Sequence, residues 1–171
     1  MYLTQFAAIF REQGLKETRV MTIHGHPSLP EDEYALFEAY CTDPECDCRR
    51  VMLNVVGKNQ GGGLLASIGF GFDRDAAMAG PYLDPLNRQS RYAEALFELV
   101  KQVLADPAYV ARLERHYEQF KRAAADPEAP GYEAMQRIRT DEKRTEASTD
   151  RKAIGARKRG SGTRKKKRRK R

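Results

Sequence analysis

Strand-like stretches that alternate apolar and polar residues dominate the first half of the chain. Each is bounded by residues that favour turns. The stretches are 18–25, 34–41, 49–57 and 64–72. Alternation is clearest in the last, where one face of an extended chain would carry Leu64, Ala66, Ile68, Phe70 and Phe72. In the third stretch the shared face carries Val51, Leu53 and Val55. Because the connections are short, the pattern predicts a four-stranded antiparallel meander.

On both sides of these stretches, apolar residues recur at the spacing of a helix instead of a strand. A first helix is predicted near the start of the chain, where one helical face would carry Leu3, Phe6, Ile9 and Phe10. Gly14 then serves as a C-cap that ends this first helix. Two helices are predicted later, over about 89–105 and from Pro107 to about 124, with Asp106 as the N-cap of the second. A weaker helical pattern covers 132–146.

These elements predict an α+β fold in which a small antiparallel sheet is covered on one face by the N-terminal helix and the C-terminal helix pair. The predicted domain covers 1–125. Residues 126–150 form a linker or a marginal helix, and a disordered basic tail occupies 151–171.

Charge divides the chain into two parts. The whole chain has 31 Lys and Arg, 24 Asp and Glu and a net charge of +7. The basic tail (151–171) holds thirteen of the basic residues and no acid. Residues 1–150 contain the other 18 basic residues and all 24 acids, so they carry a net charge of -6.

The sequence shows neither a membrane-spanning segment nor a recognisable signal peptide. There is no run of eighteen apolar residues that could span a bilayer, and the start lacks a basic region and a cleavage site typical of a signal peptide. An odd cysteine count argues against a disulfide framework. We therefore expect reduced cysteines in the cytoplasm, with nucleoid or ribosome association possible, or in the nucleus if the source is eukaryotic.

All three cysteines lie within eight residues, as Cys41-x4-Cys46-x-Cys48. Clustered thiolates suit zinc, which takes four tetrahedral nitrogen or sulfur ligands. In the predicted meander they lie at the turn between the second and third strands. Asp43 and Pro44 fix this turn, and Arg49 and Arg50 favour the thiolates. The sequence therefore predicts a structural zinc site.

The fourth zinc ligand is not obvious from the sequence. His24 and His26 fall at the opposite end of the sheet, roughly 20 Å away along a six-residue strand. His116, on the last helix of the predicted domain, is the preferred candidate. The alternatives are Asp43, Glu45, Asp47, Asp73, a water molecule or a residue of a second chain.

Other interpretations of the cysteines stay open. They could be reduced core thiols, or Cys46 and Cys48 could be a redox pair, although a C-x-C ring is small and strained. A zinc-dependent hydrolase or thiol enzyme at this turn could use Glu45 or Asp47 as a general base. Tight sulfur clustering is more typical of structural zinc, so the pattern favours a protein that is not an enzyme.

The basic tail is the second functional signal, because thirteen positive charges without an acid attract polyphosphate. It has no aromatic residue for base stacking, which predicts RNA or DNA binding without sequence specificity. An anionic membrane surface is a competing target, and the tail could also be incidental in a protein-interaction adaptor. The predicted contact residues are Arg157, Lys158, Arg159, Arg164, Lys165, Lys166, Lys167, Arg168, Arg169, Lys170 and Arg171.

Two glycine-rich stretches have structural explanations. The segment KNQGGG at 58–63 lacks the residue order of a phosphate-binding loop and predicts a hairpin turn. The glycines of GFGF at 69–72 lie inside a predicted strand, where glycine marks a bulge or close packing.

Overall fold

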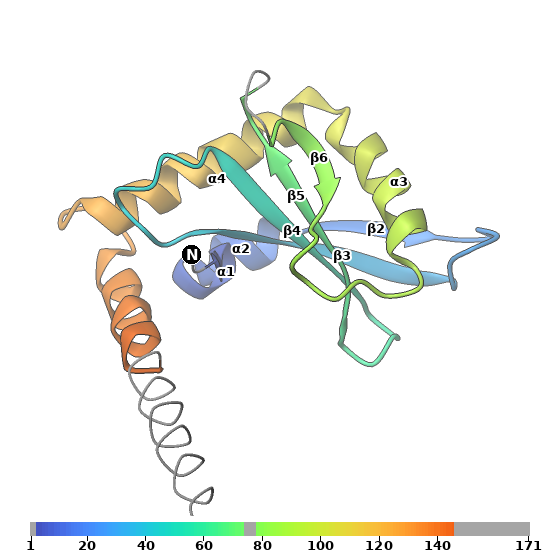
Figure 1. Cartoon of the computed structure of the whole chain (residues 1–171), viewed down its shortest axis with the longest axis horizontal. Helices are drawn as coiled ribbons and strands as arrows, with labels where there is room; N and C mark the ends of the chain where they lie inside the picture. Colours follow the sequence, from blue (N-terminus) through green and yellow to red (C-terminus); the bar gives the residue numbers. More distant parts are fainter. Residues whose placement is uncertain (1–2, 74–77, 146–171) are drawn as a thin grey trace, which may run out of the picture. The chain divides into compact units, whose positions relative to one another are not determined.

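An antiparallel sheet is the centre of the computed structural model, which describes residues 3–73 and 78–145 (Figure 1). Within these residues it has six strands, in the order β1-β3-β4-β5-β6, with β2 also paired to β3. The strands are β1 (Leu3–Gln5), β2 (Arg19–Ile23), β3 (Asp32–Cys41), β4 (Arg50–Gly57), β5 (Leu64–Gly71) and β6 (Gly80–Leu83). The α+β class is confirmed. The predicted number of four strands is wrong: β2–β5 pair antiparallel in chain order, but β1 also pairs with β3 and β6 with β5, which gives six strands in the described residues.

β1 and β2 pair with the same edge of β3, one after the other. β1 lies opposite Ala39–Cys41, and β2 lies opposite Asp32–Leu36. Between them the chain leaves the sheet to form two short helices, α1 (Phe6–Ile9) and α2 (Arg11–Glu17). Phe37 and Glu38 therefore fall in the gap between the two pairings, beside these helices.

The single N-terminal helix that the sequence predicted is divided in the structure. Leu3–Gln5 extend as β1, and the helical part is interrupted at Phe10, whose φ of -116° and ψ of 69° are not helical. Gly14 is not a C-cap: it lies inside α2, and a Cβ atom there would be 2.7 Å from Ala7 Cα. Its small size lets α1 and α2 cross closely. Thr18 follows the helix, and its hydroxyl donates to Gly14 O at 2.6 Å.

Two longer helices follow the sheet, α3 (Ala93–Leu104) and α4 (Pro107–Ala125). Asp106 caps α4 as predicted, because its carboxylate accepts from Ala108 N at 2.9 Å. Residues 132–145 are helical. The chain divides into two compact units, residues 1–135 and 136–171, and residues 136–145 are the described part of the second.

The core lies between one face of the sheet and the helices. Alternate residues of β3–β5 that are buried on this face are Tyr34, Leu36, Tyr40, Val51, Leu53, Val55, Ala66 and Ile68. Helix residues that pack against them include Leu96, Val100, Leu113 and Phe120. Figure 1 shows α4 crossing behind β4 and β5. The alternation predicted for β4 is confirmed, since Val51, Leu53 and Val55 are all buried.

Two glycine features of the sequence have the predicted structural roles. Residues 58–63 connect β4 to β5 as a hairpin, and Gly61 and Gly62 have positive φ angles of 73° and 70°. Gly69 pairs with Tyr82 of β6, and a Cβ at this position would lie 2.3 Å from the tyrosine Cζ. The glycine therefore makes room for the ring.

Candidate metal centre

The three cysteines converge at one end of the sheet. Cys41 is the last residue of β3, Cys46 lies in the connection to β4, and Cys48 is two residues before β4 begins. Their sulfur atoms lie within 4.8 Å of one another. Cys41 is buried and the other two are half-buried. The structure therefore brings the three predicted thiol ligands together.

Local hydrogen bonds shape the segment that carries Cys46 and Cys48. The carboxylate of Asp43 accepts from Glu45 N at 3.0 Å, and Asp43 O accepts from Cys46 N at 3.4 Å. These contacts form the turn predicted from Asp43 and Pro44. At its other end, Arg50 N donates to Cys48 O at 2.7 Å, as the chain enters β4.

Lys121 of α4 fastens this segment to the helix. Its ammonium group donates to two backbone carbonyls, Asp43 O and Cys46 O, the second at 2.6 Å. The lysine therefore bridges the start and the middle of the cysteine turn. Its positive charge also favours the thiolate form of Cys46.

The two half-buried thiols differ in how readily they lose a proton. Hydrogen bonding from the Cys48 side chain lowers the pKa of Cys46. Burial, followed by interaction with the other two cysteines, raises the pKa of Cys48 to about 12. A bound cation would have to displace the Cys48 proton, since the thiolate is the ligand form.

The two neighbouring arginines have different positions. Arg49, expected beside the thiols, pairs with carboxylates: its Nε lies 2.9 Å from Asp73 Oδ1 and its Nη1 lies 3.3 Å from Glu118 Oε1. Arg50 interacts with the side chains of Tyr82 and Cys48. Burial disfavours the charged guanidinium, but the interactions with Tyr82 and Cys48 together outweigh it and raise the pKa of Arg50. Arg50 is therefore the arginine that faces the cysteine cluster.

His116, the sequence candidate for the fourth ligand, has carboxylates on both ring nitrogens. Nδ1 lies 2.6 Å from Glu38 Oε2, and Nε2 lies 3.0 Å from Glu17 Oε2. The ring stacks on Phe6, with a centroid distance of 4.1 Å and an angle of 10° between the planes. It is 1% exposed. These contacts give His116 a packing role between α1, α2, β3 and α4.

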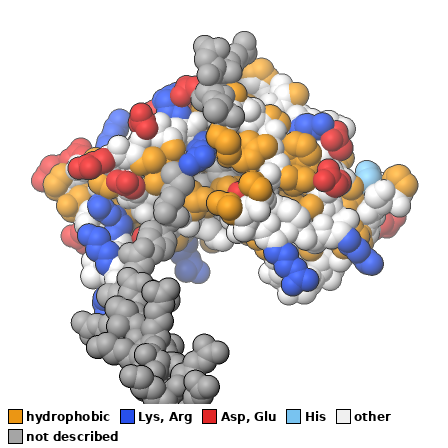
Figure 2. Space-filling model, viewed as in Figure 1, with side chains coloured by type: hydrophobic (Ala, Val, Ile, Leu, Met, Phe, Trp, Pro, Cys, Tyr) orange, Lys and Arg blue, Asp and Glu red, His pale blue; other side chains and the backbone are white. Residues whose placement is uncertain are grey.

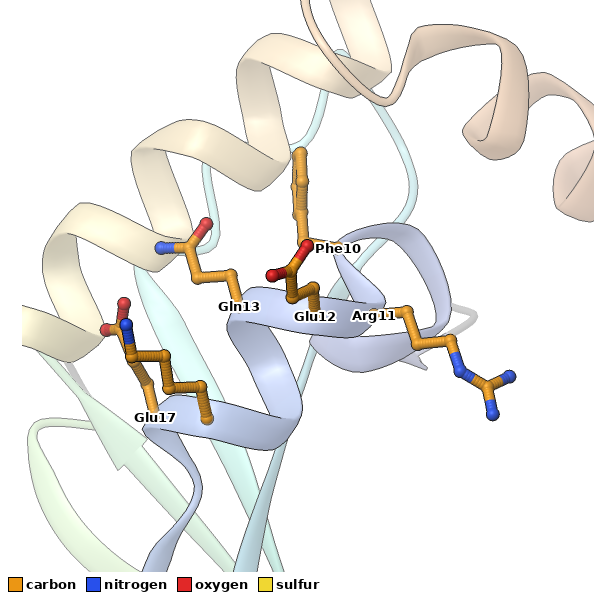
Figure 3. A pocket seen from close by; sticks show the side chains of 6 residues that line it. Phe10, Arg11, Glu12, Gln13 and Glu17 are labelled. Atoms are coloured by element: carbon orange, nitrogen blue, oxygen red, sulfur yellow. The ribbon is translucent and has the colours of Figure 1, made fainter.

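A surface hollow of about 420 Å³ lies beside Glu17, the carboxylate that contacts His116 Nε2. Its lining includes Phe10, Glu12, Gln13 and Glu17 of the Phe10–Glu17 segment. In Figure 3, Gln13 and Glu17 point toward α4, whereas Arg11 points away. Gln13 Oε1 accepts from Gln119 of α4 at 3.0 Å. The polar groups on this side thus join α2 to α4.

The other predicted ligands lie apart from the thiols or have other contacts. His24 and His26 belong to the loop between β2 and β3, at the opposite end of β3 from Cys41. Asp73 pairs with Arg49. Among the residues described, the three cysteines are the group of His, Cys, Asp or Glu side chains close enough to share an ion. The predicted nucleic-acid contacts, Arg157 to Arg171, lie outside the described residues.

Sequence reasoning missed Lys121 and the carboxylate partners of His116. A signal for the latter exists: Glu38 alternates with Leu36 and Tyr40 on the core face of β3. A charged residue at such a position needs a polar partner. His116 lies on the apolar stripe of α4, which offers one. Lys121 has no comparable sequence signal.

None of the helices in the described part of the chain is both long and apolar enough to cross a bilayer. Comparison with known proteins gives no family assignment: no family model, no curated protein and no solved structure matches this chain significantly.

Proposed function

We propose that this chain is a zinc-binding protein without enzymatic activity, in which Cys41, Cys46 and Cys48 hold a structural zinc ion. The observation that carries the proposal is the approach of the three sulfur atoms to within 4.8 Å of one another. Tetrahedral zinc with sulfur ligands at about 2.3 Å holds neighbouring sulfurs about 3.8 Å apart. A small contraction of the turn would therefore bring the three sulfurs to coordination distance of one ion.

The position of the site supports a structural role. Cys41 is fixed by the pairing of β1 with the end of β3. Cys46 lies in a segment that Lys121 fastens to α4. An ion held by Cys41, Cys46 and Cys48 would connect strand, turn and helix, so metal binding would contribute directly to folding stability.

Metal analysis of the purified full chain tests this proposal. We expect about one zinc per chain in the wild type and a large loss in Cys41→Ser, Cys46→Ser and Cys48→Ser. His24→Gln is the matched control, because His24 lies in the loop at the opposite end of β3 from Cys41 and its replacement should leave the zinc content unchanged. A cobalt-substituted sample should show a thiolate charge-transfer band that Cys46→Ser weakens. Metal-free wild type with undiminished thermal stability contradicts the proposal.

We further propose that the basic tail (151–171) associates with RNA or DNA. Its thirteen basic residues and lack of acids support this, whereas residues 1–150 carry a net negative charge. Contact would be with phosphates and therefore independent of sequence. If about six charges meet phosphates on a duplex, the slope of log affinity against log salt is about -5.

Deletion of 151–171 tests the tail separately from the metal. We expect the full chain to bind duplex DNA and unrelated RNA in gel-shift assays and to lose affinity as salt rises. The deletion variant should lose this binding and keep its zinc. Equal binding by both proteins would exclude the tail as the contact.

A further inference from the structure

A groove of about 560 Å³ lies on the face of the sheet opposite the core. The strand register explains its position, because Ala39, Met52, Gly69 and Tyr82 stand side by side across β3–β6. These residues alternate with the core-facing ones. The groove thus has the sheet as its floor, and the loop that follows β6 forms one wall, through Asp84, Leu86 and Asn87.

Exposed apolar side chains are concentrated around this groove. Six large apolar residues are conspicuously exposed in the described part of the chain, and four of them line it: Leu3, Leu64, Met78 and Leu86. The other two are Leu15 and Val20. Figure 2 shows hydrophobic side chains gathered in the middle of the view. Contiguous exposed apolar surface of this kind marks a binding site more often than isolated residues do.

The wall that carries Leu86 is well ordered by hydrogen bonds. Leu86 is 92% exposed. Next to it, Asn87 N donates to Asp84 Oδ2 at 3.0 Å. The Gln89 amide pairs with both backbone groups of Ser67, accepting from N at 3.0 Å and donating to O at 3.1 Å. The loop is therefore fixed in a conformation that presents a leucine to solvent, ready for contact with a ligand.

The polar residues differ between the two ends of the groove. Arg50 stands at one end, held by the side chains of Tyr82 and Cys48. Asn54 stands four residues further along β4, about 13 Å away. Asp84 is buried, with its carboxylate turned to Asn87. Arg50 is the one cation among the described lining residues, so the groove is electrically asymmetric.

We propose that this groove binds a small amphipathic anion, with its apolar body against Met52, Tyr82 and Leu86 and its carboxylate, sulfonate or phosphate at Arg50. The volume falls within the range of sites for small organic ligands, which combine apolar walls with a few polar groups. A guanidinium is well suited to planar anionic groups. This inference does not require bound zinc or nucleic acid, although Arg50 also interacts with the proposed zinc ligand Cys48.

Fluorescence titration of the full chain with 8-anilinonaphthalene-1-sulfonate, an aromatic anion, tests the groove. We expect Leu86→Asp and Met52→Glu to weaken binding roughly tenfold or more, because each removes an apolar contact and adds a negative charge. Leu15→Asp is the matched control, since Leu15 is 58% exposed and lies outside the groove. It should bind like the wild type. Leu86→Asp is the safer variant for folding, which circular dichroism verifies.

The charge requirement is tested by competition at about 0.15 M ionic strength. Decanoate should displace the fluorescent anion, and decyltrimethylammonium, with an equally long chain, should not. Arg50→Gln should weaken the binding of both anions. The zinc content is measured on the same sample. Because the basic tail attracts any anion, the comparison is between variants with identical tails. Equal binding by Leu86→Asp and wild type, an equal loss in Leu15→Asp, or equal displacement by the cation overturns the proposal.

Discussion

The Nδ1 atom of His116 lies 2.6 Å from Glu38 Oε2, and both side chains are buried. The same carboxylate oxygen accepts from the Tyr40 hydroxyl at 2.9 Å. Glu17 contacts the other ring nitrogen, and Phe6 stacks on the ring. Residues from four elements therefore meet at one histidine. This polar cluster joins the N-terminal helices to the sheet and to α4 in the interior of the first unit.

Breaking this pair from one side should destabilise the fold strongly. We expect Glu38→Leu or His116→Leu each to cost about 3 kcal/mol or more of unfolding free energy, because the remaining partner is left buried without its contact. The double variant should cost less than the sum, since it leaves neither member of the pair buried without the other. Urea denaturation of the four proteins measures this coupling. Strictly additive effects would show that the contact contributes no coupling energy.

Removal of the Lys121 ammonium should loosen the cysteine turn. Lys121→Met removes the donor to Asp43 O and Cys46 O while keeping an apolar side chain of similar length. A loss of about 1–3 kcal/mol in the metal-bound turn corresponds to roughly 5- to 150-fold weaker zinc binding. Competition with a chromophoric chelator measures the affinity. Lys101→Met is the control, because Lys101 pairs with Glu98 on α3, away from the turn. Lys121→Met should bind zinc clearly more weakly than Lys101→Met.

The acid side of the stability profile should depend on Asp32. Burial disfavours ionisation of this carboxyl, but hydrogen bonds from Asn59 N, Glu33 N and the Gln60 side chain outweigh it and lower the pKa below 3.8. A depressed pKa contributes stability above about pH 4 that is lost as the pH falls through the folded value.

The stability difference between wild type and Asp32→Asn should therefore be largest near neutral pH and shrink below about pH 4. Urea titrations at a series of pH values measure it. The same variant should loosen the 58–63 hairpin, because Asp32 accepts from Asn59 N at 3.0 Å. A pH-independent difference would mean that ionisation of Asp32 is not coupled to folding.

A side chain at Gly69 should displace Tyr82. Its Cβ would lie 2.3 Å from the ring, which is too close for the present packing. We expect Gly69→Val to destabilise the chain by about 1–3 kcal/mol and to change the tyrosine fluorescence. Thermal denaturation measures the first effect. Gly63→Val is the control, because a Cβ there meets no atom within 4 Å.

The sequence patterns located four strands and two helices well, because alternation and capping are local signals. The predicted stretches 18–25, 34–41, 49–57 and 64–72 contain or overlap β2–β5, and Asp106 caps α4 as expected. β1 was not predicted, since its three residues become a strand through pairing with distant Ala39–Cys41. β6 was not predicted because its Gly80-Pro81 start has loop composition.

The metal centre was predictable in part because its three cysteines also form a local signal. Cysteine spacing is visible in the sequence, and a turn between two strands brings neighbouring thiols together. Contacts between distant elements are not visible in this way. Lys121 reaches Cys46 O across seventy-five residues, and His116 reaches Glu38 across seventy-eight. Which polar side chain meets which depends on how α4 crosses the sheet.

The pairing of the Gln89 amide with Ser67 also limits how the sheet can grow. β6 pairs with Ile68–Gly71, and no strand in the described part of the chain pairs with the outer edge of β5 at Leu65–Ser67. The Gln89 side chain and Ser90 N occupy backbone groups that an incoming strand would use. Exposed strand edges promote polymerisation between molecules. Together with Asp84 N, which also donates to Ser67 O, these groups protect this edge against strand addition from a neighbouring copy.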